Sequence, residues 1–286
     1  MRNAIGIDIG GTRLRVARIA PGGAVEARLS EPTDRQPLAA LAQIERLAGT
    51  LRNAATCGAG IGVPGRVDVA GGGVLSGGYV DFSGIPLAGL LGRATRLPVF
   101  VDNDANMGLA AEMRLGAARS VAHAAMLTIG TGIGGALMLD GRIFRGRMAA
   151  GQLGHITVDI DGAECLCGRR GCLETASSGT ALGRLIAEGG RAPSTTAQDL
   201  LESKDSADMA ILARWAGPLR AGIDSLIATL DPELVVLGGG LGEAACAALA
   251  RFPPLSPWYR CKVVPAQMGD DAGVVGAGLT ALELGP

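Results

Sequence analysis

Residues 5–19 read IGIDIGGTRLRVARI, a short apolar run that ends at Gly10-Gly11 and continues as alternating apolar and polar residues. Residues 125–139 read AMLTIGTGIGGALML and repeat the order of apolar run, clustered glycines and second apolar run. Short apolar or alternating runs bounded by glycine predict strands joined by tight turns. We therefore predict two copies of one unit, strand, glycine turn and strand, with one copy in each of two lobes.

The length of 286 residues accommodates two domains, since a domain usually holds about 100–200 residues. We predict an N-terminal α/β lobe made of residues 1–110 plus 273–286 and a C-terminal α/β lobe made of residues 111–272. Hydrophobic periodicity predicts strands over 4–9, 12–19, 25–29, 59–63, 98–101, 124–129, 136–139 and 234–237, and helices over 37–51, 105–115, 206–230 and 272–284. The helices over 105–115 and 272–284 are expected to carry the chain across the lobe boundary and to serve as a hinge.

The composition argues against several classes of function. A formal net charge of −1 lacks the basic surplus that nucleic-acid binding requires, so we expect no nucleic-acid partner. Residues 121–139 carry no formal charge over a length sufficient to cross a bilayer, but glycines interrupt them, and a strand pair is the better prediction. The N-terminus has no apolar segment followed by a cleavage site, so we expect a cytoplasmic protein with no membrane partner.

The two glycine turns predict phosphate binding. Glycine lets backbone N–H groups approach phosphate oxygens, because no Cβ stands in the way. Asp8 comes directly before the first turn, where its carboxylate is placed to hold Mg²⁺ through water, and the Thr12 hydroxyl adds a donor. A single glycine turn is usually only a tight turn. Two such turns facing each other predict a triphosphate held between the lobes.

A histidine and three cysteines are clustered between residues 155 and 172, and they are His155, Cys165, Cys167 and Cys172. In a reducing cytoplasm clustered cysteines indicate metal binding rather than disulfides. One imidazole and three thiolates form a closed tetrahedral zinc site, which is structural because no position remains for water. The alternative is three buried cysteines near a histidine. Cys57, Cys246 and Cys261 show no such pattern and are expected to be small buried residues, and His123 is expected to be structural.

The run Val101-Asp102-Asn103-Asp104-Ala105-Asn106 offers two carboxylates at the end of a predicted strand. A hydroxyl that attacks a phosphoryl group needs a carboxylate within hydrogen-bond reach as its base. If the strand persists, Asp102 and Asp104 share one face, and the residues alone do not choose between them. An aspartate that caps the helix over 105–115 is the structural alternative.

These segments together resemble a known family. Residues 7–12 match the first phosphate motif of actin-like sugar kinases, residues 128–132 resemble the second, and Gly238-Gly239-Gly240 resembles their adenosine motif, in the family's order. Gly154-His155 and the three cysteines closely match the zinc signature of the ROK family, named for repressors, open reading frames and kinases. The resemblance spans nearly the whole chain. It implies an α/β, two-lobed, actin-like ATPase (ribonuclease H-like) fold with an interlobe cleft and a structural zinc loop that forms one wall of the sugar site.

The resemblance also implies the roles of individual residues. The family's catalytic aspartate follows an asparagine and precedes Ala-Asn, so Asp104 is the implied general base. The implied ATP and Mg²⁺ contacts are Asp8, Gly10, Gly11, Thr12, Thr131, Gly132, Gly239 and Gly240. The implied sugar contacts are Gly65, Asn103, Gln152, His155 and Glu174, with His155 giving one ring nitrogen to zinc and the other to a sugar hydroxyl. Gln152 departs from the family's usual Glu, and residues 79–84 lack its Asn-x-Pro pattern.

The function implied is ATP- and Mg²⁺-dependent phosphorylation of a hexose hydroxyl, O6 of glucose or of an N-acetylated hexosamine. A second possibility is a sugar-sensing repressor, the family's other branch, but Asp8 lies too close to the start for a helix-turn-helix domain to precede it. A third is a sugar-binding protein without kinase activity, which Gln152 and the altered loop would favour. By the same resemblance we expect a homodimer or homotetramer.

Overall fold

The computed structural model describes residues 2–254 and 256–285. The chain divides into two compact units. The first comprises Met1–Arg119, Arg145–Ala149 and Asp270–Pro286, and the second comprises Ser120–Phe144 and Ala150–Gly269. The prediction placed the boundaries after residues 110 and 272, and no pattern in the sequence indicated that residues 145–149 belong to the first unit.

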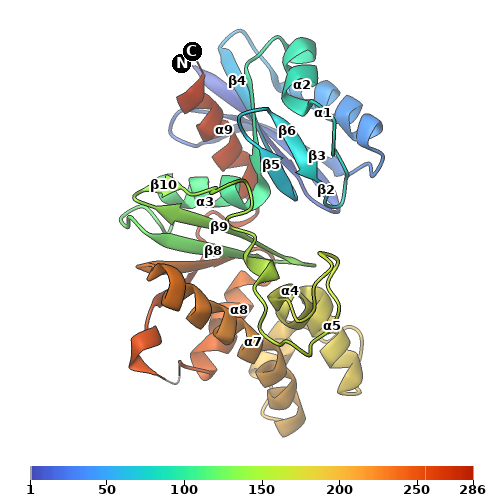
Figure 1. The fold of residues 1–286 in the computed structure, drawn as a ribbon. Helices are drawn as coiled ribbons and strands as arrows, with labels where there is room; N and C mark the ends of the chain where they lie inside the picture. Colours follow the sequence, from blue (N-terminus) through green and yellow to red (C-terminus); the bar gives the residue numbers. More distant parts are fainter. Residues whose placement is uncertain (1, 255, 286) are drawn as a thin grey trace. The chain divides into compact units, whose positions relative to one another are not determined.

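The first unit contains a five-stranded sheet with the order β3-β2-β1-β4-β7 (Figure 1). Its strands are β1 (Asn3–Ile9), β2 (Arg13–Ile19), β3 (Val25–Pro32), β4 (Thr56–Val63) and β7 (Val99–Asn103). The first three strands are antiparallel, as the predicted glycine hairpin requires, whereas β4 runs parallel to β1 and β7 parallel to β4. In this register Asp8 lies directly opposite Arg15.

The side chains of β1 alternate between two buried layers. The odd-numbered ones, Ile5, Ile7 and Ile9, join a core with α1 (Pro37–Leu51) and α2 (Leu87–Thr95). Gly6 and Asp8 face α9 (Ala272–Leu284), and a Cβ on Gly6 would stand 1.8 Å from the Val274 carbonyl oxygen. The unit also contains α3 (Asp104–Arg114) and the small hairpin of β5 (Arg66–Asp68) and β6 (Gly73–Ser76). The close approach of α9 thus places the Asp8 carboxylate beside the start of that helix.

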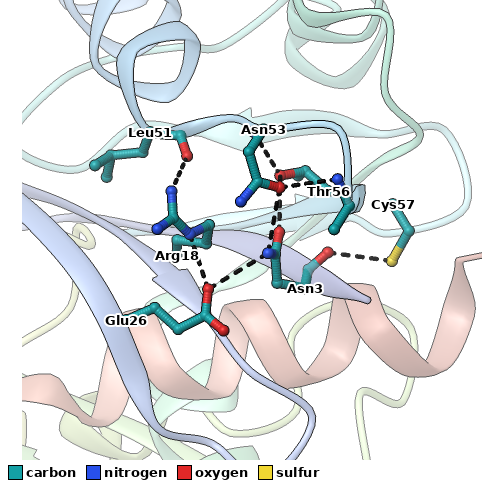
Figure 2. A network of polar contacts seen from close by, with 8 residues as sticks. Asn3, Arg18, Glu26, Leu51, Asn53, Thr56 and Cys57 are labelled. Carbon is teal, nitrogen blue, oxygen red and sulfur yellow. Dashed lines mark hydrogen bonds and ion pairs between the residues drawn. The ribbon is translucent and has the colours of Figure 1, made fainter. Parts of the chain in front are cut away.

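A polar network fixes the start of β1 (Figure 2). Asn3 is buried, its Nδ2 donates to Asn53 Oδ1 at 3.3 Å, and Thr56 Oγ1 donates to its Oδ1 at 2.7 Å. Arg18 Nε donates to Glu26 Oε2 and its Nη1 donates to the Leu51 carbonyl oxygen, both at 2.8 Å. These contacts join the end of α1 and the start of β4 to the first three strands. They lie at the end of β1 remote from Gly10, so we assign them to stability.

The second unit contains a five-stranded sheet with the order β10-β9-β8-β11-β12. Its strands are β8 (Ala124–Ile129), β9 (Ile133–Leu139), β10 (Arg142–Ile143), β11 (Leu234–Gly238) and β12 (Lys262–Pro265). The strands β8, β9 and β10 are antiparallel, β11 is parallel to β8, and β12 is parallel to β11. Strand for strand this is the topology of the first sheet, which confirms the predicted internal repeat.

The core of the second unit centres on α7 (Ser206–Leu230). The indole of Trp215 is fully buried, and its Nε1 donates to the Ser178 carbonyl oxygen at 3.1 Å. Ser177 Oγ donates to the Trp215 carbonyl oxygen at 2.7 Å, so α7 is fastened to the junction of α4 (Leu173–Ser177) and α5 (Gly179–Glu188). The other helical elements described in this unit are α6 (Ala197–Glu202), α8 (Gly242–Arg251), η1 (Leu153–His155) and η2 (Pro257–Tyr259), and η3 (Gly269–Asp271) begins at the last residue of the unit. Among the described residues, no helix combines the length and apolarity needed to cross a membrane.

Several predicted elements have the same bounds in the structure, namely the helices over 37–51, 206–230 and 272–284 and the strand over 124–129. The strand predicted over 136–139 instead begins at Ile133, because its glycines continue the strand. A Cβ on Gly135 would stand 2.6 Å from the Leu153 side chain, so a larger residue would not fit there. The predicted turn at Asp140-Gly141 is present, with φ of 51° and 70°, the left-handed values that a two-residue hairpin turn requires.

Candidate functional site

Hydrogen bonds fix the backbone of the first glycine turn, residues 10–12. Gly10 N donates to the Arg13 carbonyl oxygen at 3.1 Å, and Thr33 Oγ1 donates to the Gly10 carbonyl oxygen at 2.7 Å. Thr33 N donates to the Thr12 carbonyl oxygen at 3.1 Å. The ring of Tyr79 covers Gly11, and a Cβ there would stand 2.9 Å from that ring. A Cβ at residue 10 would stand 2.9 Å from the Arg13 carbonyl oxygen, so the backbone itself leaves little room for a side chain in this turn.

Asp8 ends β1 beside this turn. Arg15 Nη1 lies 3.5 Å from Asp8 Oδ2, and a Cβ on Gly273 of α9 would stand 2.7 Å from the Asp8 carboxyl carbon. Burial raises the pKa of the Asp8 carboxyl to about 6, although the Arg15 guanidinium acts in the opposite direction. A buried, partly compensated carboxylate is an oxygen ligand whose charge a divalent cation would neutralise, so the donor chemistry fits Mg²⁺.

Asn103 connects the end of β7 to α3. Its Oδ1 accepts hydrogen bonds from Ala105 N at 2.9 Å and Asn106 N at 3.3 Å, which makes this asparagine the N-cap of the helix. Its Nδ2 donates to the Gly65 carbonyl oxygen at 3.0 Å. The cap is therefore Asn103, and the aspartate cap considered from the sequence is wrong. The oxygen and the nitrogen of the Asn103 amide therefore both make hydrogen bonds within the protein, and the bond from Nδ2 places Gly65 next to the start of α3.

The two candidate carboxylates differ sharply in their surroundings. The side chain of Asp102 is 6% exposed, and it accepts hydrogen bonds from Arg145 Nε at 2.8 Å and Nη2 at 2.6 Å, from Asn103 N at 2.7 Å and from Asn106 Nδ2 at 2.8 Å. Asp104 is partly exposed, and its Oδ1 accepts a hydrogen bond from Ala105 N at 2.9 Å. Burial of this carboxyl, assisted by the charge of Asp8, raises its pKa to about 7.

The second glycine turn is fastened to two helices. Gly179 N, at the start of α5, donates to the Gly130 carbonyl oxygen at 2.7 Å, and Thr180 Oγ1 donates to the Thr131 carbonyl oxygen at 2.8 Å. Glu174 Oε2, on α4, accepts a hydrogen bond from Ile133 N at 2.8 Å. Glu174, implied as a sugar ligand, thus uses one oxygen to position the glycine turn that carries Gly132.

The third glycine segment lies against the second turn. Gly239 has a φ of 76°, and a Cβ on it would stand 2.5 Å from the Ile129 carbonyl oxygen. Leu241 N donates to that same oxygen at 3.0 Å. Two of the segments implied to bind the nucleotide, 130–132 and 239–240, are therefore brought together at the ends of the adjacent strands β8 and β11.

His155, Cys165, Cys167 and Cys172 converge in the second unit, with their ligand atoms all within 4.8 Å of one another. His155 Nδ1 lies 3.5 Å from Cys165 Sγ, and Cys167 Sγ lies 3.6 Å from Cys172 Sγ. A tetrahedral zinc with bonds of about 2.3 Å separates its sulfur ligands by about 3.8 Å, so the cluster fits the ion. Gly168 N donates to the Cys165 carbonyl oxygen at 2.9 Å, and its φ of 85° allows this tight turn. Because Nδ1 faces the cysteines, the other ring nitrogen of His155 points away from them.

The remaining histidine and cysteines have local roles. His123 Nδ1 accepts a hydrogen bond from Asp140 N at 3.4 Å, at the turn between β9 and β10, as expected for a structural residue. Cys57, Cys246 and Cys261 are half-buried rather than fully buried. The thiol of Cys57 donates to the Asn3 carbonyl oxygen at 3.3 Å and that of Cys261 to the Pro232 carbonyl oxygen at 3.1 Å.

Two residues near these groups, Arg15 and Arg145, were not identified from the sequence, and Tyr79 was named only as the start of the loop 79–84, not as a residue that covers Gly11. Arg15 had a usable signal, because the hairpin register around Gly10-Gly11 places it opposite Asp8. Arg145 had none, since it is separated by 43 residues from Asp102. Tyr79 lies in an irregular segment, where no periodicity indicates the direction of a side chain. Gln152, just before η1, is half-buried, and its carbonyl oxygen accepts from His155 N at 3.1 Å.

Comparison with known proteins places these features in a family. The model of the ROK family matches residues 4–283. The chain is 32% identical to the glucokinase of Halalkalibacterium halodurans, over 96% of this chain and 93% of that one. It is 31% identical to the N-acetylmannosamine kinase of Yersinia pestis, over 98% and 99% of the two chains. A ROK family glucokinase from Streptomyces griseus, solved with glucose and AMPPNP, superposes with a TM-score of 0.83 at 28% identity, over 98% of this chain and 99% of that one. The chain therefore has the α/β actin-like ATPase fold of these proteins and belongs to the ROK family.

Proposed function

We propose that this protein transfers the γ-phosphoryl group of ATP to a hydroxyl of a hexose, O6 of glucose or of an N-acetylated hexosamine, with Asp104 as general base. The observation that carries the proposal is the contrast between the two carboxylates at the β7–α3 junction. Asp102 is nearly fully buried and accepts four hydrogen bonds, two of them from Arg145, whereas Asp104 is partly exposed, has no ion pair with an arginine among the described residues and has a pKa of about 7. A base is most effective when its pKa lies near the working pH.

In the proposed reaction Asp104 accepts the proton of the sugar hydroxyl while that oxygen attacks the γ-phosphorus. The bond from phosphorus to the bridging oxygen breaks, and ADP leaves with the electron pair. Gly10 N and Gly130 N donate within their own turns, so the other backbone amides of the segments 10–12 and 130–132 would bind phosphate oxygens and stabilise the developing charge. Asp8 would hold Mg²⁺ through water, and this ion would neutralise charge on the phosphates.

The zinc cluster would shape the sugar site. Zinc held by His155 and the three cysteines would fix the loop between residues 155 and 172, and the ring nitrogen of His155 that faces away from the sulfurs would contact a sugar hydroxyl. Sugar contacts from Asn103, Gln152, Glu174 and Gly65 complete the proposal. Cytoplasmic location and a homodimeric or homotetrameric assembly are further parts of it.

The activity is tested by measuring ADP release with a panel of sugars, including glucose, mannose, N-acetylglucosamine and N-acetylmannosamine. The proposal predicts ADP release that depends on the sugar and is strongest for one or two members of the panel. The second candidate, a sugar-binding protein without kinase activity, is favoured by Gln152, which replaces a carboxylate with an amide. Sugar binding by calorimetry without ADP release would support the second candidate over the first.

Zinc content is expected to depend on the cluster. Replacing Cys167 with serine removes one thiolate, so zinc should fall below one per chain and the KM for the sugar should rise by about tenfold or more. Metal analysis by mass spectrometry and steady-state kinetics measure both effects. Cys246→Ser, outside the cluster, is the matched control and should retain its zinc. A Cys167→Ser protein with one zinc per chain and unchanged kinetics would contradict the assignment.

Sugar preference is expected to depend on residue 152. In Gln152→Glu a carboxylate accepts hydrogen bonds from two adjacent hydroxyls, whereas the amide has only one acceptor atom. The ratio of kcat/KM for glucose to kcat/KM for N-acetylmannosamine should therefore rise by about tenfold. Parallel kinetics on the two sugars give this ratio. An unchanged ratio would mean that residue 152 does not set the preference.

A further inference from the structure

The carboxylate of Asp102 is the polar centre of the β7–α3 junction. Its Oδ1 accepts hydrogen bonds from Asn103 N at 2.7 Å and from Asn106 Nδ2 at 2.8 Å, and so joins the end of the strand to the first turn of α3. Its Oδ2 receives both Arg145 Nε at 2.8 Å and Arg145 Nη2 at 2.6 Å. The Asp102 side chain is only 6% exposed, so water does not replace these partners.

Asn106 depends on this carboxylate for its orientation. The Asn106 side chain is buried, and its Oδ1 has no hydrogen-bond partner within residues 2–254 and 256–285. The bond from Nδ2 to Asp102 is therefore the polar contact that orients this amide. Asp104 lies in the same first turn of α3, between Asn103 and Asn106, so whatever holds that turn also sets the direction of the Asp104 carboxylate.

Arg145 reaches Asp102 from a constrained segment. Residues 145–149 belong to the first unit, although the chain on both sides of them belongs to the second. Met148 N donates to the Arg145 carbonyl oxygen at 2.8 Å, and Gly146 and Met148 have φ of 53° and 68°. A methionine in the left-handed region is uncommon, and such conformations persist where the surrounding structure requires them. The backbone of this segment is thus shaped by a turn that begins at Arg145.

We propose that Arg145 is a positioning residue for Asp104, an inference that rests on the proposed function. Arg145 Nε and Nη2 both donate to Asp102 Oδ2, so the guanidinium holds this buried carboxylate in one orientation. In that orientation Asp102 Oδ1 accepts from Asn103 N and from Asn106 Nδ2. By holding the carboxylate in this way, Arg145 maintains both bonds and fixes the turn that aims Asp104.

The test compares Arg145→Met, Arg145→Lys, Asp102→Asn and the double variant Asp102→Asn/Arg145→Met. Arg147→Met is the matched control, since Arg147 is exposed and lies in the same segment. In Arg145→Met we expect kcat to fall by about 10²-fold, the loss typical of a misplaced reacting group, while the Kd for the sugar changes less than about threefold. Arg145→Lys should recover about tenfold of that loss.

The double variant Asp102→Asn/Arg145→Met distinguishes two effects of removing Arg145, namely the loss of its charge and the loss of its hold on residue 102. Its amide at residue 102 keeps an acceptor oxygen for Asn103 N and Asn106 Nδ2 and buries no charge, so its kcat should exceed that of Arg145→Met by about tenfold. Hydrogen exchange of the Ala105 and Asn106 amides should be faster in Arg145→Met than in wild type. In the double variant it should be slower than in Arg145→Met. If Arg145→Met does not fold, Arg145→Lys and the double variant decide by the same criteria.

The inference is overturned if Arg145→Met keeps a kcat within about threefold of wild type, or if the double variant is no better than Arg145→Met. Unchanged hydrogen exchange at the start of α3 would overturn it as well. Failure of the proposed function is a separate result, namely no sugar-dependent ADP release by wild type. The exchange measurement then still tests whether Arg145 holds the first turn of α3, because it does not require activity.

Discussion

Asp104→Asn lowers kcat by about 10²–10⁴-fold, because the amide does not accept the proton of the attacking hydroxyl. The Kd for the sugar, measured by calorimetry, stays within about threefold of wild type, since an asparagine still makes hydrogen bonds of similar length. Nucleotide affinity is expected to be unchanged. A variant with near-normal turnover would show that Asp104 is not the base.

The free energy of unfolding of Asp104→Asn should depend on pH in a way that distinguishes loss of the base from damage to the fold. Burial raises the pKa of Asp104 from 3.8 to about 7, so the folded state binds the proton more tightly than the unfolded state. The ionised carboxylate therefore destabilises the folded state. The destabilisation is complete above about pH 7, and it decreases as the pH falls from 7 towards 3.8, the pKa of the unfolded state. Asp104→Asn should raise the free energy of unfolding at pH 8 by at most about 4 kcal/mol, with a gain that vanishes near pH 4. Urea denaturation at both pH values measures it, and a variant that is less stable at pH 8 would contradict the origin of this pKa.

The pH dependence of wild type gives the second large effect. Asp104 acts as a base only when it is deprotonated, so kcat/KM should fall about tenfold for each pH unit below its pKa of about 7. Between pH 8 and pH 5 the expected loss is about 100-fold. Steady-state kinetics at saturating Mg²⁺ measure the profile, with the residual activity of Asp104→Asn as the control that should lack this limb. A wild-type profile that stays flat from pH 5 to pH 8 would contradict the assignment.

The hairpins could be predicted because their signals are local. The apolar and alternating runs around Gly10-Gly11 and Gly130 fix the strands, and the same order of residues in both halves indicated the repeat. The long helix over 206–230 was equally accessible from its periodicity. The zinc cluster could be predicted because three of its ligands lie within eight residues of sequence, Cys165 to Cys172.

The parts that escaped prediction depend on contacts between distant segments. Asn103, rather than an aspartate, caps α3, because both of its amide groups find partners in the loop at Gly65 and the turn at Ala105. The surroundings of Asp102 and Asp104 differ because Arg145, from another part of the sequence, contacts only Asp102 of the two. The continuation of β9 through Gly135 follows from packing against Leu153. Local residue preferences contain none of this information.

The central claim is tested most directly by following the labelled γ-phosphate of ATP in a single turnover with the best sugar of the panel. The account predicts that wild type places the label on the hexose, with phosphorus NMR locating it on O6, and that Asp104→Asn binds both substrates but forms no labelled sugar in the same time. Label that appears only as inorganic phosphate, or equal sugar labelling by wild type and Asp104→Asn, would contradict it.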